Sequence, residues 1–229
     1  MKLRGAFIVT MAAFLLVACY GIYEKRTYTD VTRDASYLET VYVAEIPENF
    51  ALSCCAELER TLPEAPLVMK VSAVEELEYL AGTGRQKVRV EAVFQGGGVR
   101  EGEEIYLTKT RWRFYPLDLY GDGYAMDRGF VNLMEIGEDY LVFAGEQADS
   151  LGGRTPVYEL FGEELVIAPI FSYRTHENRI VETDEHSTYV PYREVSANEF
   201  FAETQAGMDA FLALKENIFE QYGQNLEGE

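Results

Sequence analysis

Cysteine is scarce in this 229-residue chain, which has only three. Two of them, Cys54 and Cys55, are adjacent, and adjacent cysteines can close only a strained ring. This arrangement excludes a conventional disulfide framework. We therefore expect Cys54 and Cys55 to be small, half-buried residues of a helix.

Basic residues and prolines are also few. The chain has 20 Lys and Arg against 39 Asp and Glu, which gives a formal net charge of −19. Nucleic-acid binding and peripheral attraction to anionic lipid both need an excess of positive charge, so this balance argues against both. Only 7 residues are proline, whereas 48% are hydrophobic, and this excludes a disordered or collagen-like chain. The composition is that of an acidic globular protein.

Motifs that would indicate catalysis or cofactor binding are missing. The chain has neither a G-x-S-x-G nucleophile elbow nor a P-loop. The two histidines, His176 and His186, are further apart than the close pairs typical of zinc sites. Three aspartates in a glycine-rich stretch miss the spacing of an EF-hand loop and predict only an acidic turn. They are Asp118, Asp122 and Asp127. The sequence therefore predicts no catalytic residue, metal or cofactor.

The first 23 residues have the pattern of an export signal. Lys2 and Arg4 precede 19 uncharged residues at positions 5–23. Within them, Leu16-Val17-Ala18-Cys19 resembles the lipobox of bacterial lipoproteins. The resemblance implies cleavage before Cys19 and attachment of diacylglycerol to its sulfur, and two acyl chains suffice for stable anchoring.

Two alternatives remain for this segment. Nineteen helical residues rise roughly 28 Å, about the thickness of the hydrocarbon core, so the segment could be an uncleaved signal-anchor. Cys19 could also precede an ordinary cleavage that releases the protein. All three interpretations predict a folded part outside the cytoplasmic membrane, and the first two predict anchoring to the bacterial cell membrane.

Periodicity predicts the domain organisation of the rest. Residues 24–46 are expected to be a polar tether, and 47–66 a short helical segment that ends at prolines. Alternating apolar residues predict strands at 67–74, 86–94, 105–108, 130–134, 140–144, 157–161 and 165–171, with a long loop at 109–129. We expect a charged loop at 173–195 and a C-terminal amphipathic helix at 196–223. Ser196 and Glu199 match a capping box at the start of that helix.

These elements predict a mainly β fold with flanking helices, namely a small antiparallel OB-like barrel over 67–172 with the C-terminal helix packed on it. The order of three motifs resembles the netrin-like, or tissue-inhibitor-of-metalloproteinase-like, OB domain. The motifs are RVEAVFQG at 89–96, EG before IYL at 101–107, and GEDYLVFA at 137–144. Gln95 stands where that family usually has lysine, and the family's disulfides are missing. Inhibition of proteases is therefore not carried over to this chain.

Aromatic residues are concentrated in the long loop. They are Trp112, Phe114, Tyr115, Tyr120 and Tyr124. Such rings can stack on carbohydrate or a protein partner, or they can plug the open end of the barrel. The leading hypothesis is a membrane-tethered extracytoplasmic binding module that uses this loop. The alternatives are a surface hydrolase with an acidic or metal-assisted site near His176 and His186, and a stalk-like assembly subunit that uses the terminal helix.

Overall fold

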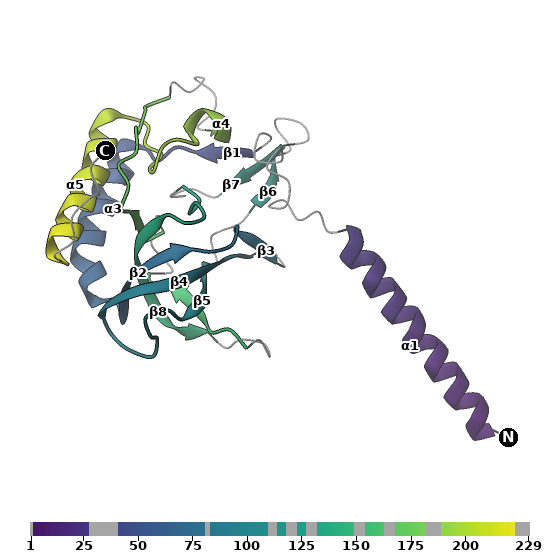
Figure 1. Ribbon diagram of the computed structural model, residues 1–229. Coiled ribbons are helices and arrows are strands. Elements are labelled where there is room, and N and C mark those ends of the chain that lie inside the picture. The colour runs from purple at the N-terminus through teal and green to yellow at the C-terminus, as the bar shows by residue number, and fades with distance from the viewer. Residues whose placement is uncertain are drawn as a thin grey trace.

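The computed structural model describes most of the chain (Figure 1). The described residues are 2–27, 41–80, 83–109, 114–117, 123–126, 132–148, 154–162, 168–181 and 189–222.

The centre of the fold is a closed five-stranded barrel. Its strands are β2 (Leu67–Ala73), β4 (Thr83–Gln95), β5 (Glu104–Lys109), β9 (Val157–Leu160) and β8 (Asp139–Ala148). They pair in the order β2-β4-β5-β9-β8, and β8 returns to β2. The expected mainly β fold with a small barrel and flanking helices is thus confirmed, with one correction to the predicted antiparallel barrel. The barrel is mixed rather than antiparallel throughout, because β5 and β9 are parallel.

The barrel strands form where apolar residues alternate along the sequence. Val88 and Val90 of β4 and Ile105 of β5 are fully buried, as their spacing of two predicts. β2 is buried on both faces, since every residue except Lys70 is buried, whereas an alternating pattern is typical of a strand with one buried face. The second face of β2 joins the apolar core that contains Leu58 of the preceding helix.

The tight turn at the end of β4 packs against the residues that precede β2. Gly96 has φ +90°, and a Cβ at this position would lie 2.1 Å from the carbonyl oxygen of Pro66. The amide Nε2 of Gln95 donates to the carbonyl oxygens of Pro63 and Ala65, at 3.1 and 2.7 Å. Gln95 therefore joins the end of β4 to the turn that precedes β2.

Two helices pack together beside the barrel (Figure 1). α3 (Glu48–Thr61) lies within the predicted helical segment and leads into a 3-10 turn, η1 (Leu62–Glu64). Cys54 and Cys55 are buried in α3 and neither forms a disulfide. Burial raises the pKa of Cys55 to about 12. α5 (Gln205–Gln221) confirms the C-terminal helix but begins nine residues later than expected. The predicted capping box is wrong, because Thr204 is the N-cap and Glu199 is buried before the helix.

A second sheet accounts for most of the other differences from prediction. Its order is β11 (Tyr189–Pro191), β1 (Val41–Ala44), β7 (Gly123–Met126) and β6 (Phe114–Leu117). Strand β1 lies in the predicted tether, β6 and β7 lie in the predicted long loop, and β11 and α4 (Tyr192–Val195) lie in the predicted charged loop. β1 is ordered because it pairs on both sides and buries Val41 and Val43 completely.

Two predicted strands are also revised. The part of 130–134 that the structure describes, residues 132–134, contains no strand. In the described part of the predicted strand at 165–171, the structure has β10 (Ile170–Ser172), which ends one residue later and pairs with β8. The connection between β2 and β4 contains a further short strand, β3 (Glu78–Leu80), which pairs with the start of β4.

The N-terminal helix α1 (Lys2–Thr27) extends away from the rest of the molecule (Figure 1). Its apolar side chains are largely exposed: Phe14 is 70% and Leu16 72% accessible. In the parts of the chain that the structure describes, no helix combines the length and the apolar character needed to span a bilayer.

Candidate functional site

The structure brings together only some of the predicted site residues. Phe114 and Tyr115 lie on β6 and Tyr124 on β7, in one antiparallel hairpin where Tyr115 pairs with Ala125. Trp112 and Tyr120 fall outside the described residues, as do His186 and the three aspartates of the acidic turn. Cys19 is exposed on α1. The aromatic segment is therefore an ordered hairpin rather than a long loop, at least at its two strands.

A cavity of about 450 Å³ lies elsewhere, between α5 and the segment that follows β10. The segment contributes His176, Glu177 and Asn178 to its walls, and α5 contributes Leu212, Lys215 and Glu216. Leu212 packs against the hydrophobic core and gives the cavity an apolar wall. This volume is in the range of small-molecule binding sites.

Two asparagines hold the segment in place. Asn178 has φ +45°, a conformation that asparagine tolerates better than most residues, and its Oδ1 accepts from the backbone N–H of Glu199 at 2.8 Å. In return, Asn198 Oδ1 accepts from the N–H of Arg179 at 2.9 Å, and Asn198 Nδ2 donates to the Arg179 carbonyl at 2.6 Å. The segment and residues 198–200 are thus fixed to each other by reciprocal bonds.

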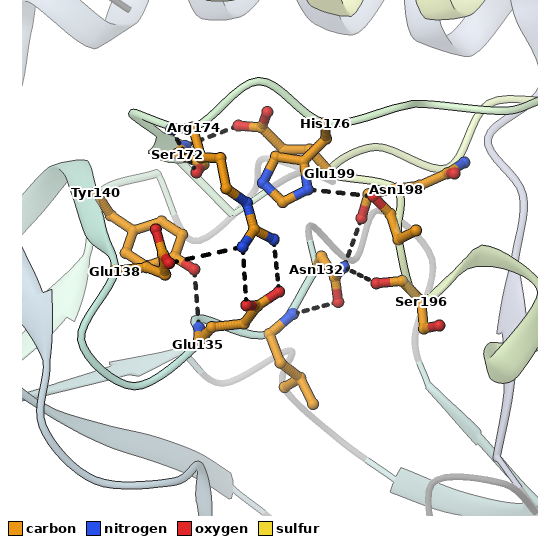
Figure 2. Close-up of polar contacts among 12 residues, drawn as sticks. Asn132, Glu135, Glu138, Tyr140, Ser172, Arg174, His176, Ser196, Asn198 and Glu199 are labelled. Carbon is orange, nitrogen blue, oxygen red and sulfur yellow. Dashed lines mark hydrogen bonds and ion pairs between the residues drawn. The ribbon is translucent and has the colours of Figure 1, made fainter. Parts of the chain in front are cut away.

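His176 is held by the same neighbouring chain. Its Nδ1 lies 3.2 Å from the carbonyl oxygen of Ala197 (Figure 2). A carbonyl can only accept, so the proton of this bond is on Nδ1. The Nε2 atom is buried and has no hydrogen-bond partner among the described residues. Burial lowers the pKa of His176, and Arg174 and Lys215 lower it further, so the ring is neutral near pH 7.

A buried ion pair lies under the cavity. The Lys215 Nζ is 2.6 Å from Glu199 Oε2, and the two side chains are only 4% and 2% exposed. Glu199 Oε1 also accepts from the N–H of Ser172 at 2.8 Å, and Lys215 donates to the Arg174 carbonyl at 3.1 Å. Burial raises the pKa of Glu199, whereas the ammonium of Lys215 acts in the opposite direction. This pair connects α5 to the end of β10.

The other charges of the network are also paired (Figure 2). Arg174 donates to both carboxylate oxygens of Glu135, at 2.8 and 3.1 Å, and lies 3.6 Å from Glu138. The hydroxyl of Tyr140 accepts from the N–H of Glu135 at 2.8 Å. The guanidinium therefore links the segment after β10 to the residues that precede β8.

Asn132 links a further part of the chain to this network. Its Nδ2 donates to the carbonyls of Ser196 and Asn198, at 2.6 and 2.5 Å, and its Oδ1 accepts from the Tyr192 hydroxyl at 2.6 Å. Asn132 and Tyr192 are both buried. Residues near 132, 178 and 198 are thus joined by hydrogen bonds into one network, which we call the frame.

This arrangement is suited to binding. The frame is internally hydrogen-bonded, and Glu199 neutralises Lys215, the one cation among the described residues that line the cavity. No group of three or more His, Cys, Asp or Glu side chains in the described parts of the chain could hold a metal ion. The residues that build the cavity were not predicted, apart from His176. One signal was available, since Lys215 interrupts the apolar stripe of α5 between Phe211 and Phe219.

No family model and no curated protein matches this chain.

Proposed function

We propose that the protein is a membrane-tethered extracytoplasmic binding module. The observation that carries this proposal is α1, whose apolar side chains are exposed on a helix that projects from the body. Exposure of a large apolar side chain costs roughly 1.5–3 kcal/mol relative to burial. A helix with many such side chains is therefore expected to contact lipid or to be removed during export.

The lipobox-like residues determine the form of the anchor that we favour. Leu16, Val17, Ala18 and Cys19 lie within α1, and the Cys19 thiol is exposed and free. Cleavage before Cys19 and diacylation of its sulfur would remove most of the apolar helix and replace it with lipid.

The architecture supports binding as the role of the body. Small OB-like barrels commonly bind ligands through the loops and hairpins at the mouth of the barrel. The netrin-like domain, which this sequence resembles, is a barrel of this type. We propose the hairpin β6–β7 within 109–129, with Phe114, Tyr115 and Tyr124, as a surface for a protein or carbohydrate partner. Because a fold does not determine function, this surface is proposed from its aromatic residues.

The anchor is tested by the variant Cys19→Ala in the native bacterial host. The wild-type protein is expected in the membrane fraction and labelled by a radioactive fatty acid, whereas Cys19→Ala should lose the label. Cys54→Ala is the matched control, because Cys54 is buried in α3 and should leave label and location unchanged.

The two forms of the tether give different results for the variant. Cys19→Ala released from the membrane or mislocalised indicates the lipid anchor, and unlabelled protein that stays in the membrane indicates the signal-anchor. Wild-type protein found in the cytosol with residues 1–18 still attached would overturn the proposal.

A further inference from the structure

A short parallel bridge joins the chain that leaves β1 to the chain that enters α5. Ile46 pairs with Ala202 in this bridge. The N–H of Ile46 donates to the carbonyl of Phe201 at 2.9 Å, and the N–H of Glu203 donates to the carbonyl of Ile46 at 3.0 Å. We call the bridge and the residues beside it the junction, which consists of residues 45–48 and 201–204. Through β1, the junction connects the second sheet to the helices α3 and α5.

Glu45 is buried at the junction without a partner. Its side chain is only 5% exposed and forms neither a hydrogen bond nor an ion pair with any residue that the structure describes. Glu45 and Glu203 both flank the bridged pair. Because successive side chains of an extended chain alternate, the two carboxyl groups lie on the same side. A buried carboxylate with a like charge beside it and no partner is unfavourable, whereas a protonated carboxyl is uncharged.

The other charged groups of the junction are both acidic, and both have partners. The carboxylate Oε2 of Glu203 accepts from the N–H of Glu48, the first residue of α3, at 3.3 Å. The Oε2 of Glu48 accepts from the hydroxyl of Thr204, the N-cap of α5, at 2.8 Å. The N-terminal ends of helices stabilise negative charge. Glu45 has no such contact, so we expect the proton of the junction on Glu45, whose pKa is raised from 4.5 to about 7 by burial and by Glu203.

We propose that the junction is a proton-operated switch, which is closed while Glu45 is protonated and opens locally, without unfolding of the barrel, when Glu45 is ionised. Opening breaks the two backbone bonds of the bridge and lets water reach the Glu45 carboxylate. Because the closed state favours the protonated carboxyl, opening is least frequent below about pH 4.5, rises with pH and levels off at about pH 7. Acid therefore fastens the second sheet to the helices, and neutral pH loosens it. The switch depends neither on the tether nor on the hairpin β6–β7.

Hydrogen exchange of the full-length chain in mild detergent, resolved to single amides by NMR between pH 5 and 8, tests this inference. The amides of Ile46 and Glu203 report on the bridge, and the reference is the amide of Val90 in the barrel, which donates to Glu103 at 2.9 Å. After correction for the intrinsic exchange rate, the opening constant of the bridge should rise about tenfold per pH unit up to about pH 7 and then level off. It should exceed that of Val90 at least tenfold at every pH.

Three variants assign the effect to Glu45. Glu45→Gln keeps the size of the side chain but cannot ionise, so its bridge should open about as rarely at pH 8 as at pH 5. Glu203→Gln removes only the neighbouring charge, and the rise with pH should become smaller. Glu146→Gln is the control at an exposed position on β8 and should behave like the wild type.

Several results would overturn the inference. If the bridge amides open no more often than the Val90 amide, opening is global unfolding and the local switch does not exist. A wild-type opening constant that does not change with pH, or the same rise in Glu45→Gln as in the wild type, would also overturn it. None of these results bears on the membrane anchor, which the Cys19 experiment measures separately.

Discussion

Lys215 lies in the middle of the apolar face of α5 and is one of the few charged side chains buried in the described part of the chain. A buried ammonium is stable only when it is paired, and Glu199 and the Arg174 carbonyl provide partners at 2.6 and 3.1 Å. The spacing of three residues between Ser196 and Glu199 predicts a local helix cap instead. The sequence does not predict the pairing of Glu199 with Lys215, because Lys215 lies 16 residues further on, in a helix that begins nine residues after the predicted start.

The variant Lys215→Met should be strongly destabilised. It retains much of the side-chain volume but leaves the Glu199 carboxylate buried without its cation, which typically costs about 3–5 kcal/mol. Urea unfolding followed by circular dichroism measures the loss. The double variant Lys215→Met/Glu199→Gln should recover at least half of it, because no charge is then left unpaired. A single variant within about 1 kcal/mol of wild type would show that the two charges are not coupled as described.

Glu45 should make stability depend on pH. It is only 5% exposed, and burial together with the nearby Glu203 raises its pKa from 4.5 to about 7. The folded state therefore favours the protonated carboxyl. Its contribution to stability is fully present below about pH 4.5 and is lost as the pH rises to about 7, a total of about 3 kcal/mol.

The variant Glu45→Gln should remove this dependence. Its free energy of unfolding should match that of wild type near pH 4 and exceed it by about 3 kcal/mol above pH 7. Denaturant titrations at several pH values measure the difference. Glu203→Gln should reduce the effect by removing the neighbouring charge, while Glu146→Gln, an exposed position, should leave it unchanged. A constant difference across the pH range would contradict the assignment.

At the scale of elements, the start of α5 is decided by Thr204. Its hydroxyl oxygen accepts from the N–H of Gly207 at 3.2 Å, and the same hydroxyl donates to Glu48 on α3 at 2.8 Å. Ser196, the expected cap, instead donates to the carbonyl of Arg193 at 3.3 Å on the surface. One residue thus caps α5 and ties it to the first turn of α3.

The pair Thr204→Ala and Ser196→Ala distinguishes the two starts. Thr204→Ala should cost about 1–2 kcal/mol, the usual cost of losing an N-cap and its bond to a neighbouring helix. Ser196→Ala should change the free energy of unfolding by less than about 0.5 kcal/mol. Thermal or urea unfolding of both variants measures these losses. A larger loss for Ser196→Ala than for Thr204→Ala would identify Ser196 as the N-cap instead.

The elements that could be predicted are those with strong local patterns. The strands β2, β4 and β8 have apolar residues that repeat or run together, and α3 is bounded by prolines. The strands of the second sheet could not be predicted, because each is four residues or fewer and is stabilised by partners far away in the chain. β1 pairs with β7 in parallel and with β11 in antiparallel orientation. Such pairings follow from tertiary structure and leave little periodic signal.

The residues around the cavity could not be predicted from the sequence, for the same reason. Its walls come from the segment after β10 and from α5, and its frame from residues near 132, 135 and 198. His176 is conspicuous in the sequence because the chain has only two histidines, whereas the asparagines and the Lys215–Glu199 pair belong to no motif. Only the fold brings them together.

At the scale of the whole molecule, the barrel, the helices α3 and α5 and the second sheet share one hydrophobic core. Residues as distant as Val43 of β1, Val90 of β4 and Phe211 of α5 belong to it. Among the α1 residues whose burial the structure describes, none belongs to this core, and the large apolar side chains are exposed. The folded part from residue 41 onward is thus stabilised by its own core, whereas α1 is the segment that we propose attaches it to the membrane.

Two truncations measure this separation. Deletion of residues 1–27 should shift the melting temperature of the remaining protein by less than about 2 °C, because the large apolar side chains that the structure describes on α1 are exposed. Deletion of residues 1–44 also removes β1, with Val41 and Val43 completely buried, and burial of each side chain contributes roughly 1.5–3 kcal/mol. For a domain of this size each kcal/mol shifts the melting temperature by about 2–4 °C, so the longer deletion should lower it by about 10 °C or more. Differential scanning calorimetry compares the two proteins, and an equal loss in both would mean that α1 stabilises the body directly.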